Sequence, residues 1–131
     1  MDLQEINKYD AVFRFNRAPT EGYEKHVGTS TTYRFSHPDN LGFEESPNEI
    51  AVYSVESKSS LERLLMYAKK FPDRLPLFVM SPALVEYASH GLTRMPSLGY
   101  TAVNVALQMC RQISVYGFFT SDQQGSRHHY Y

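Results

Sequence analysis

The sequence predicts an α/β domain, in which helices cover the faces of a β-sheet. Short apolar runs typical of strands alternate along the chain with longer segments of helical periodicity, and this alternation favours an α/β sheet. Hydrophobic residues make up 42% of the 131 residues and aromatic residues 14%, enough to build a core. We therefore expect a single domain, or part of one, over residues 1–131.

Composition and missing motifs exclude several classes of function. The net charge is -1, from 13 basic and 14 acidic residues. The chain therefore lacks the positive electrostatic potential that binds nucleic acid or an anionic membrane. No apolar run approaches the roughly 20 residues of a membrane span. The start, "MDLQEINKYD", is neither a signal peptide nor a transit peptide. The patterns GxSxG and GxGxxG and the P-loop are absent, so no motif supports a hydrolase, dinucleotide-binding or kinase-like function.

Three strands are expected in the first half of the chain. Ala11–Phe15 alternates apolar and polar side chains at a period of two, and Thr32–Ser36 and Ile50–Val55 are similar short runs. The stretch 17–31 contains proline and glycines and predicts a loop, and 41–49 predicts a polar linker.

A helix is expected after the third strand. Ser59 and Glu62 have the spacing of a capping box, in which each side chain satisfies a free backbone N–H at the helix start. Pro72 ends the helix. The apolar residues between these signals fall on one face: Leu61, Leu64, Leu65 and Ala68.

A fourth strand and a second helix follow. Leu75–Met80 is an apolar run of strand length. Ser81 then has the position of a cap, Pro82 that of the first helical residue, and Gly91 that of the stop.

A third helix begins at "PSLG", and a last strand is expected over Ile113–Phe119, followed by a loop over 120–127. Val105 and Met109 widen the apolar stripe of this helix, so we expect it to be buried on most sides. The stripe itself consists of Ala102, Val103, Ala106, Leu107 and Cys110.

Asn16 is the first candidate for a binding residue. It lies two residues after Arg14, on the same face of the first strand and at its carboxyl end, where ligands bind in open α/β sheets. The alternative is a turn-forming asparagine whose side chain satisfies backbone groups.

The "PSLG" segment is the second candidate. Ser97 can cap the following helix, and Gly99 would let a ligand approach the backbone. The free N–H groups and the dipole of a helix start suit an anion such as a phosphate. A plain helix start is the alternative.

The end of the chain and its one cysteine remain open to two interpretations each. His128 and His129 are adjacent, so in an extended segment they point to opposite faces, and with no carboxylate or cysteine at ligand spacing they predict no metal site. They belong either to a solvated tail or to a site where an imidazole donates to a leaving phosphate or moves a proton.

Cys110 is either a buried, inert thiol or half of a disulfide whose partner is not on this chain.

Taken in order, three segments resemble the motifs of the animal-type sialyltransferases, glycosyltransferase family 29. "YDAVFRFNRAPTEGYEKHVGTSTTYRF" resembles the second half of the large sialyl motif, D-x-V-x-R-x-N-x-A-P followed by G-(Y/F)-E-x-D-V-G-S-x-T-T. "PSLGYTAVNVALQMCRQISVYGF" is similar to the small motif, which reads P-S-(S/T)-G, A-L-x-x-C and V-x-V-Y-G-F. "HHYY" resembles the third motif, H-Y-(Y/W), and the three together cover about half the chain.

The resemblance implies a Rossmann-like, mixed α/β sheet with flanking helices, of the GT-A type. It implies transfer of sialic acid from CMP-sialic acid to a sugar hydroxyl of a glycan, with inversion and with neither a metal nor another cofactor. His129 would be the catalytic residue beside the CMP phosphate, because without a metal a hydrogen-bond donor must stabilise the departing negative charge. Cys110 would be half of the family's disulfide. The implied donor-binding residues are Asn16, Ser97, Gly99, Gly117, Phe118, His128 and Tyr130.

The chain also departs from the family pattern. The family has an upstream cysteine with a G-N-S-G-type turn, and a fourth motif with the histidine base and a glutamate, and neither is present here. We therefore expect an incomplete domain without turnover as this chain, because a general base supplies about 10² to 10⁴ in rate. The alternative is a non-catalytic CMP-sugar-binding or interaction module. His26, Leu98 and Phe119 replace the usual Asp, Ser or Thr, and Gly. The family also implies the Golgi lumen as location.

Overall fold

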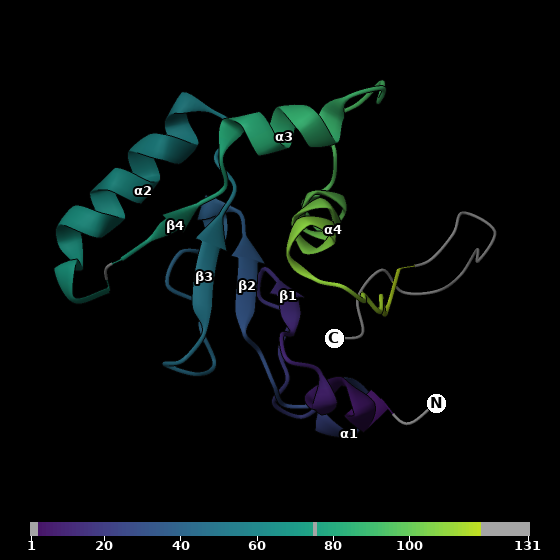
Figure 1. Cartoon of the computed structure of the whole chain (residues 1–131). Coiled ribbons are helices and arrows are strands. Elements are labelled where there is room, and N and C mark those ends of the chain that lie inside the picture. The colour runs from purple at the N-terminus through teal and green to yellow at the C-terminus, as the bar shows by residue number, and fades with distance from the viewer. Residues whose placement is uncertain (1–2, 75, 119–131) are drawn as a thin grey trace, which may run out of the picture.

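The structure is a computed structural model of the 131-residue chain, and it describes residues 3–74 and 76–118. Strands and helices alternate as the sequence predicts (Figure 1). The elements are η1 (Leu3–Lys8), β1 (Phe13–Phe15), α1 (Glu24–Val27), β2 (Tyr33–Ser36), η2 (Pro38–Asn40), β3 (Ile50–Tyr53), α2 (Lys58–Lys70), η3 (Pro72–Arg74), β4 (Phe78–Val79), α3 (Pro82–Ser89) and α4 (Leu98–Met109).

The described strands form one sheet of order β1-β2-β3-β4, and the predicted α/β class is confirmed. All three neighbouring pairs are parallel, so the antiparallel pairing that a mixed sheet would contain is not found among the described strands. Parallel pairing places the carboxyl ends of these strands at one edge, and that edge is where ligands bind in such sheets.

One face of the sheet carries the apolar core. Side chains alternate between the faces of a strand, so Phe13 and Phe15 point the same way, and their register partners Tyr33 and Phe35 join them. Helix α4 contacts β1 and β2 on this face and also contacts α3 (Figure 1). The buried centre of this core consists of Phe35, Met80, Leu98 and Ala102.

The structure corrects one of the predicted helix starts and confirms another. Helix α2 begins at Lys58, and its cap is Ser57, whose hydroxyl accepts from the Ser60 N–H at 3.1 Å, so the Ser59–Glu62 capping box is wrong. Ser57 takes the cap because its backbone is extended while Ser59 is already helical. Ser81 precedes α3 as predicted but makes no capping hydrogen bond through its side chain.

Helix α4 is less buried than predicted. Ala102 and Ala106 face the core, whereas the side chains of Leu107 and Met109 are 65% and 59% exposed. In the described part of the chain, α4 packs against β1, β2 and α3. A stripe of apolar residues indicates which side of a helix can be buried, but the neighbouring elements decide how much of it is.

The last predicted strand is also wrong over the residues that are described. Residues 113–118 pair with no strand in the described part of the chain. Gly117 has a φ of +74°, outside the β region, and Val115 is 51% exposed. The composition of this segment alone therefore did not identify a strand, because a strand also needs a neighbouring strand to pair with.

Candidate functional site

Five of the predicted contact residues lie in the described part of the chain: Asn16, Ser97, Gly99, Gly117 and Phe118. They come from the end of β1, the start of α4 and the segment after α4. His128, His129 and Tyr130 lie outside the described residues.

Asn16 sits immediately after β1 in a left-handed backbone conformation, with a φ of +49°. Asparagine tolerates this conformation better than most residues. Its N–H donates to the Phe35 carbonyl at 2.8 Å, and its side-chain oxygen accepts from the His37 N–H at 3.1 Å and from Asn40 Nδ2 at 3.0 Å. Asn16 is thus the turn-forming residue of the alternative interpretation. Its NH₂ group has no hydrogen-bond partner among the described residues, so it remains able to donate to a ligand.

Ser97 caps α4 as predicted. Its backbone is extended and its hydroxyl accepts from the Tyr100 N–H at 3.2 Å. A side-chain cap satisfies one of the first four N–H groups of a helix and leaves others of the first turn for different partners. The segment therefore has the geometry of a capped helix start.

Gly99 and Phe118 are brought together. A Cβ on Gly99 would lie 2.9 Å from two carbon atoms of the Phe118 ring, so the glycine makes room for this ring. The ring also meets that of Phe15 edge to face, with the centroids 6.2 Å apart. This contact joins the end of β1 to the start of α4, next to Asn16. The sequence suggested that Gly99 lets a ligand approach, but in the structure its open side is occupied by Phe118.

Tyr9 was not among the predicted residues, and it holds the segment that leads to Phe118. Its hydroxyl donates to Ser114 Oγ at 2.7 Å and shares a hydrogen bond of 2.8 Å with the Tyr116 hydroxyl. This hydrogen bond raises the pKa of Tyr116. No local pattern reveals such a contact, because more than a hundred residues separate the partners.

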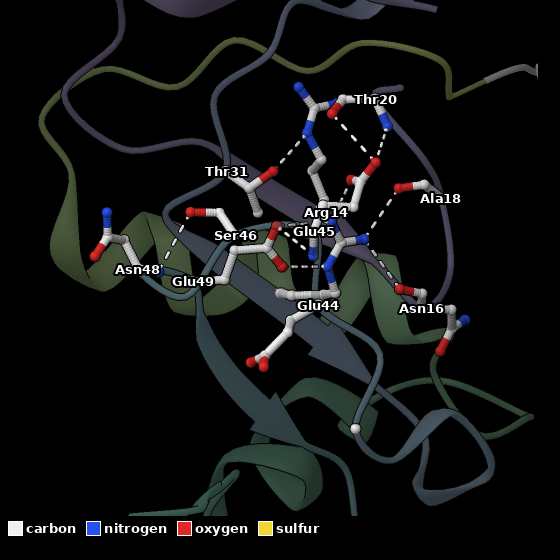
Figure 2. Close-up of polar contacts among 12 residues, drawn as sticks. Arg14, Asn16, Ala18, Thr20, Thr31, Glu44, Glu45, Ser46, Asn48 and Glu49 are labelled. Carbon is white, nitrogen blue, oxygen red and sulfur yellow. Dashed lines mark hydrogen bonds and ion pairs between the residues drawn. The ribbon is translucent and has the colours of Figure 1, made fainter. Parts of the chain in front are cut away.

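A buried ionic cluster supports the turn that carries Asn16, and it was also missed (Figure 2). Arg34 is fully buried and pairs with Glu49 at 2.6 Å and with Glu45 at 2.8 Å. It also donates to the carbonyls of Asn16 and Ala18, at 3.1 and 3.0 Å. The available signal was an arginine inside an aromatic strand, followed by two glutamates four residues apart in a "polar linker".

Arg14 lies beside Arg34 and holds a different loop. Its side chain donates to the carbonyls of Val27 and Ser30, at 2.7 and 3.0 Å, and to the Thr31 hydroxyl at 3.0 Å. These contacts fix the segment between α1 and β2. Arg14 therefore has a structural role, although it shares a strand with Asn16.

A further polar pair lies at the carboxyl edge of the sheet. His37 Nδ1 is 3.4 Å from Glu56 Oε1, and the Ser54 hydroxyl donates to the same carboxylate oxygen at 3.2 Å. His37 directly follows β2 and Ser54 directly follows β3, and the His37 N–H donates to Asn16, so this group borders the Asn16 turn.

One hollow in the described part of the chain is lined by none of the predicted residues. This hollow of about 460 Å³ lies between the 42–50 loop, β3, β4 and the end of α2, and it is lined by other side chains. Within residues 3–74 and 76–118, no three His, Cys, Asp or Glu side chains are grouped to hold a metal ion. None of the helices in the same ranges is long and apolar enough to cross a membrane. Cys110 is the C-cap of α4 and half-buried, and its thiol is free.

Comparison with known proteins identifies relatives over nearly the whole chain. The family model of glycosyltransferase family 29 (sialyltransferase) matches residues 4–131. CMP-N-acetylneuraminate-beta-galactosamide-alpha-2,3-sialyltransferase 1 of Sus scrofa is 31% identical, over 97% of this chain and 42% of the relative. The Gallus gallus protein of the same name is 31% identical, over 98% of this chain and 42% of the relative. The chain thus spans about two fifths of the length of these curated relatives.

The fold is similar to that of solved sialyltransferases. A crystal structure of a mammalian sialyltransferase in complex with Gal-beta-1-3GalNAc-ortho-nitrophenol matches with a TM-score of 0.79 and 27% identity, over 97% of this chain and 53% of that chain. A second crystal structure of a mammalian sialyltransferase gives a TM-score of 0.77 and 28% identity, over 97% and 52% of the two chains.

Proposed function

The chain belongs to glycosyltransferase family 29, the sialyltransferases, and from this membership we propose that residues 1–131 form the donor-binding part of a sialyltransferase catalytic domain. The donor is CMP-sialic acid, and the acceptor is a galactose hydroxyl of a glycan, as the names of the relatives suggest. The location that we propose with it is the Golgi lumen.

The proposed reaction needs a site that holds a phosphate as it leaves. The acceptor oxygen bonds to the anomeric carbon of sialic acid with inversion, the bond from that carbon to the phosphate oxygen breaks, and CMP departs with the electron pair. The hydroxyl proton passes to a general base, the role of the fourth-motif histidine in the family. Negative charge then grows on the phosphate, and preorganised hydrogen-bond donors stabilise it. We assign this role to His129, with His128 and Tyr130 lining the same pocket.

The observation that carries the proposal is the arrangement at the end of β1. Asn16 holds its side-chain oxygen in two hydrogen bonds, so its NH₂ group is the part that faces a ligand. The Phe118 ring packs against Gly99 at the start of α4 and against Phe15 at the end of β1, which supports a site at this corner of the sheet that also includes Ser97 and Gly117. An amide donor next to a helix start suits a phosphate acceptor.

A calorimetric titration with CMP tests the proposal. We expect the wild-type chain to bind CMP and Asn16→Asp to lose detectable binding. Aspartate also tolerates the left-handed turn and keeps the oxygen that accepts from His37, but it replaces the NH₂ donor with a negative charge. Asn7→Asp is the matched control, because the side-chain oxygen of Asn7 also accepts two hydrogen bonds, from the backbone N–H groups of Thr29 and Ser30.

Binding by the wild type and by Asn7→Asp, but not by Asn16→Asp, would support the donor site. Equal binding by all three chains would remove Asn16 from it. Absence of CMP binding by the wild type would overturn the donor-binding function of this chain. His129→Ala, with His26→Ala as control, tests the assignment of His129 in the same titration.

A further inference from the structure

The guanidinium group of Arg34 is fully used in hydrogen bonding. Its five N–H groups meet five acceptors: two on Glu49, one on Glu45 and the backbone carbonyls of Asn16 and Ala18. The distances run from 2.6 to 3.1 Å. Only arginine presents five donors in a fixed planar fork, so no other residue could make this set of bonds.

The two carbonyls belong to the turn that orients the Asn16 side chain. Glu45 holds the next part of the same turn, where its Oε1 accepts from the N–H groups of Thr20 and Glu21 at 2.7 and 3.2 Å. Arg34 and Glu45 are themselves paired at 2.8 Å. The turn is thus fixed through its carbonyls by the arginine and through its N–H groups by the glutamate (Figure 2).

We propose that Arg34 is a positioning residue for donor binding, which sets the Asn16 amide through the carbonyls of Asn16 and Ala18. The proposal rests on the proposed function and extends it, because Arg34 lies on the opposite face of the sheet from Phe15 and Phe118 and makes no contact with the ligand side of Asn16. Its effect passes through the backbone of the turn.

Arg14 provides a control that distinguishes the positioning role of Arg34 from a general contribution to folding. It is also buried and charged, and it is the register partner of Arg34 on β1. It donates hydrogen bonds to Val27, Ser30 and Thr31, and the neighbouring amides of Thr29 and Ser30 donate to Asn7. Loosening Arg14 should therefore affect the 27–31 loop, and loosening Arg34 should affect the Asn16 turn.

Amide hydrogen exchange on the ligand-free chain tests the positioning role without any nucleotide. The His37 amide donates to Asn16 Oδ1 and reports directly on the Asn16 side chain. Lysine keeps the charge beside Glu49 but cannot reach both carbonyls, so we expect Arg34→Lys to speed His37 exchange about tenfold or more, the range for one lost charged hydrogen bond. The amides of Thr29 and Ser30 should change little. Arg14→Lys should produce the reverse pattern.

Two outcomes would overturn the proposal. One is an unchanged His37 exchange rate in Arg34→Lys, measured against the Ser54 amide, which donates to the Ser36 carbonyl nearby. The other is an equal acceleration of His37 exchange in Arg14→Lys. If Arg34→Lys does not fold, Glu45→Gln decides in the same way, since its neutral side chain weakens the link to Arg34.

A CMP titration of the same variants gives the functional readout. Arg34→Lys should raise the Kd for CMP about tenfold, and Arg14→Lys should leave it within about twofold of wild type. If the wild type fails to bind CMP, the proposed function fails, whereas the His37 exchange rate still decides whether Arg34 positions Asn16. The two failures are therefore distinguishable.

Discussion

Arg14 and Arg34 are register partners on the parallel strands β1 and β2, and both side chains are buried on the same face of the sheet. Like charges at neighbouring positions of a sheet repel each other. The structure offsets this repulsion in two ways. Arg14 donates to carbonyl and hydroxyl oxygens, whereas Arg34 is paired with two carboxylates.

Replacing Arg34 with an apolar residue should therefore destabilise the fold. In Arg34→Met, the carboxylate of Glu49, whose side chain is 2% exposed, stays buried without its partner. Removing one partner of a buried ion pair costs about 3–5 kcal/mol. Urea denaturation of Arg34→Met should show a loss of free energy of unfolding of this size.

The double variant Arg34→Met with Glu49→Met checks the cause. It removes the unpaired charge, so it should recover part of the lost stability. Arg63→Met is the control, since the pair of Arg63 with Asp39 is exposed and should contribute less than about 1 kcal/mol. A double variant as unstable as the sum of its single variants would contradict this account.

Acid should weaken the contact between the Asn16 turn and the 42–49 loop through Glu45. Partial burial raises the pKa of Glu45, but the N–H groups of Thr20 and Glu21 and the charge of Arg34 outweigh it, so the pKa is lowered overall. A lowered pKa in the folded state stabilises the fold fully above the ordinary value of 4.5. This contribution is lost as the pH falls from that value through the folded pKa.

Glu45→Gln isolates this effect, because glutamine does not ionise. At about pH 7 the wild type should be more stable than Glu45→Gln, and the difference should shrink towards zero as the pH falls below 4.5 through the folded pKa. Urea midpoints across this range measure it. A difference that stays constant with pH would show that the ionisation of Glu45 does not contribute.

The start of α4 allows a direct test of capping. Ser97→Ala removes the acceptor for the Tyr100 N–H and should cost about 1 kcal/mol. Ser81→Ala is the matched control at α3, where the serine makes no capping bond and a smaller loss is expected. Thermal unfolding of the two variants should rank Ser97→Ala as the less stable, and the opposite order would refute the cap.

The sequence predicted the parts of the fold that depend on local pattern. The alternation of Phe13, Arg14 and Phe15 located β1, and proline, serine and glycine signals located α3 and α4. The Ile113–Phe119 strand failed because pairing depends on a distant edge. Gly117 was the local signal against a strand, because its φ is positive.

For the candidate site, the motifs suggested the residues, and the contacts around these residues came only from the structure. Asn16 and Gly99 were proposed from their motifs. Arg34 and Glu45 come from different segments, and what unites them is the closure of the 42–49 loop over β2. Tertiary closure of this kind leaves no periodic trace in a sequence.

The contact of Gly99 with Phe118 leads to a last prediction. Gly99→Ala should place a methyl group against the Phe118 ring, which is 52% exposed and free to move aside. Alanine is favoured over glycine in a helix by up to about 1 kcal/mol, so stability should change little. The ring should nevertheless leave its edge-to-face position on Phe15, and ring-current shifts of the Phe15 signals would show this.

If that ring helps to form the proposed donor site, CMP affinity should fall in Gly99→Ala and in Phe118→Ala by similar factors. The double variant should then bind no more weakly than either single variant, because both changes remove the same contact. Calorimetry on the three variants measures the coupling. Additive losses of CMP affinity would instead show that Gly99 and Phe118 contact the nucleotide independently. Gly99 would then let the ligand approach the backbone, as the sequence suggested.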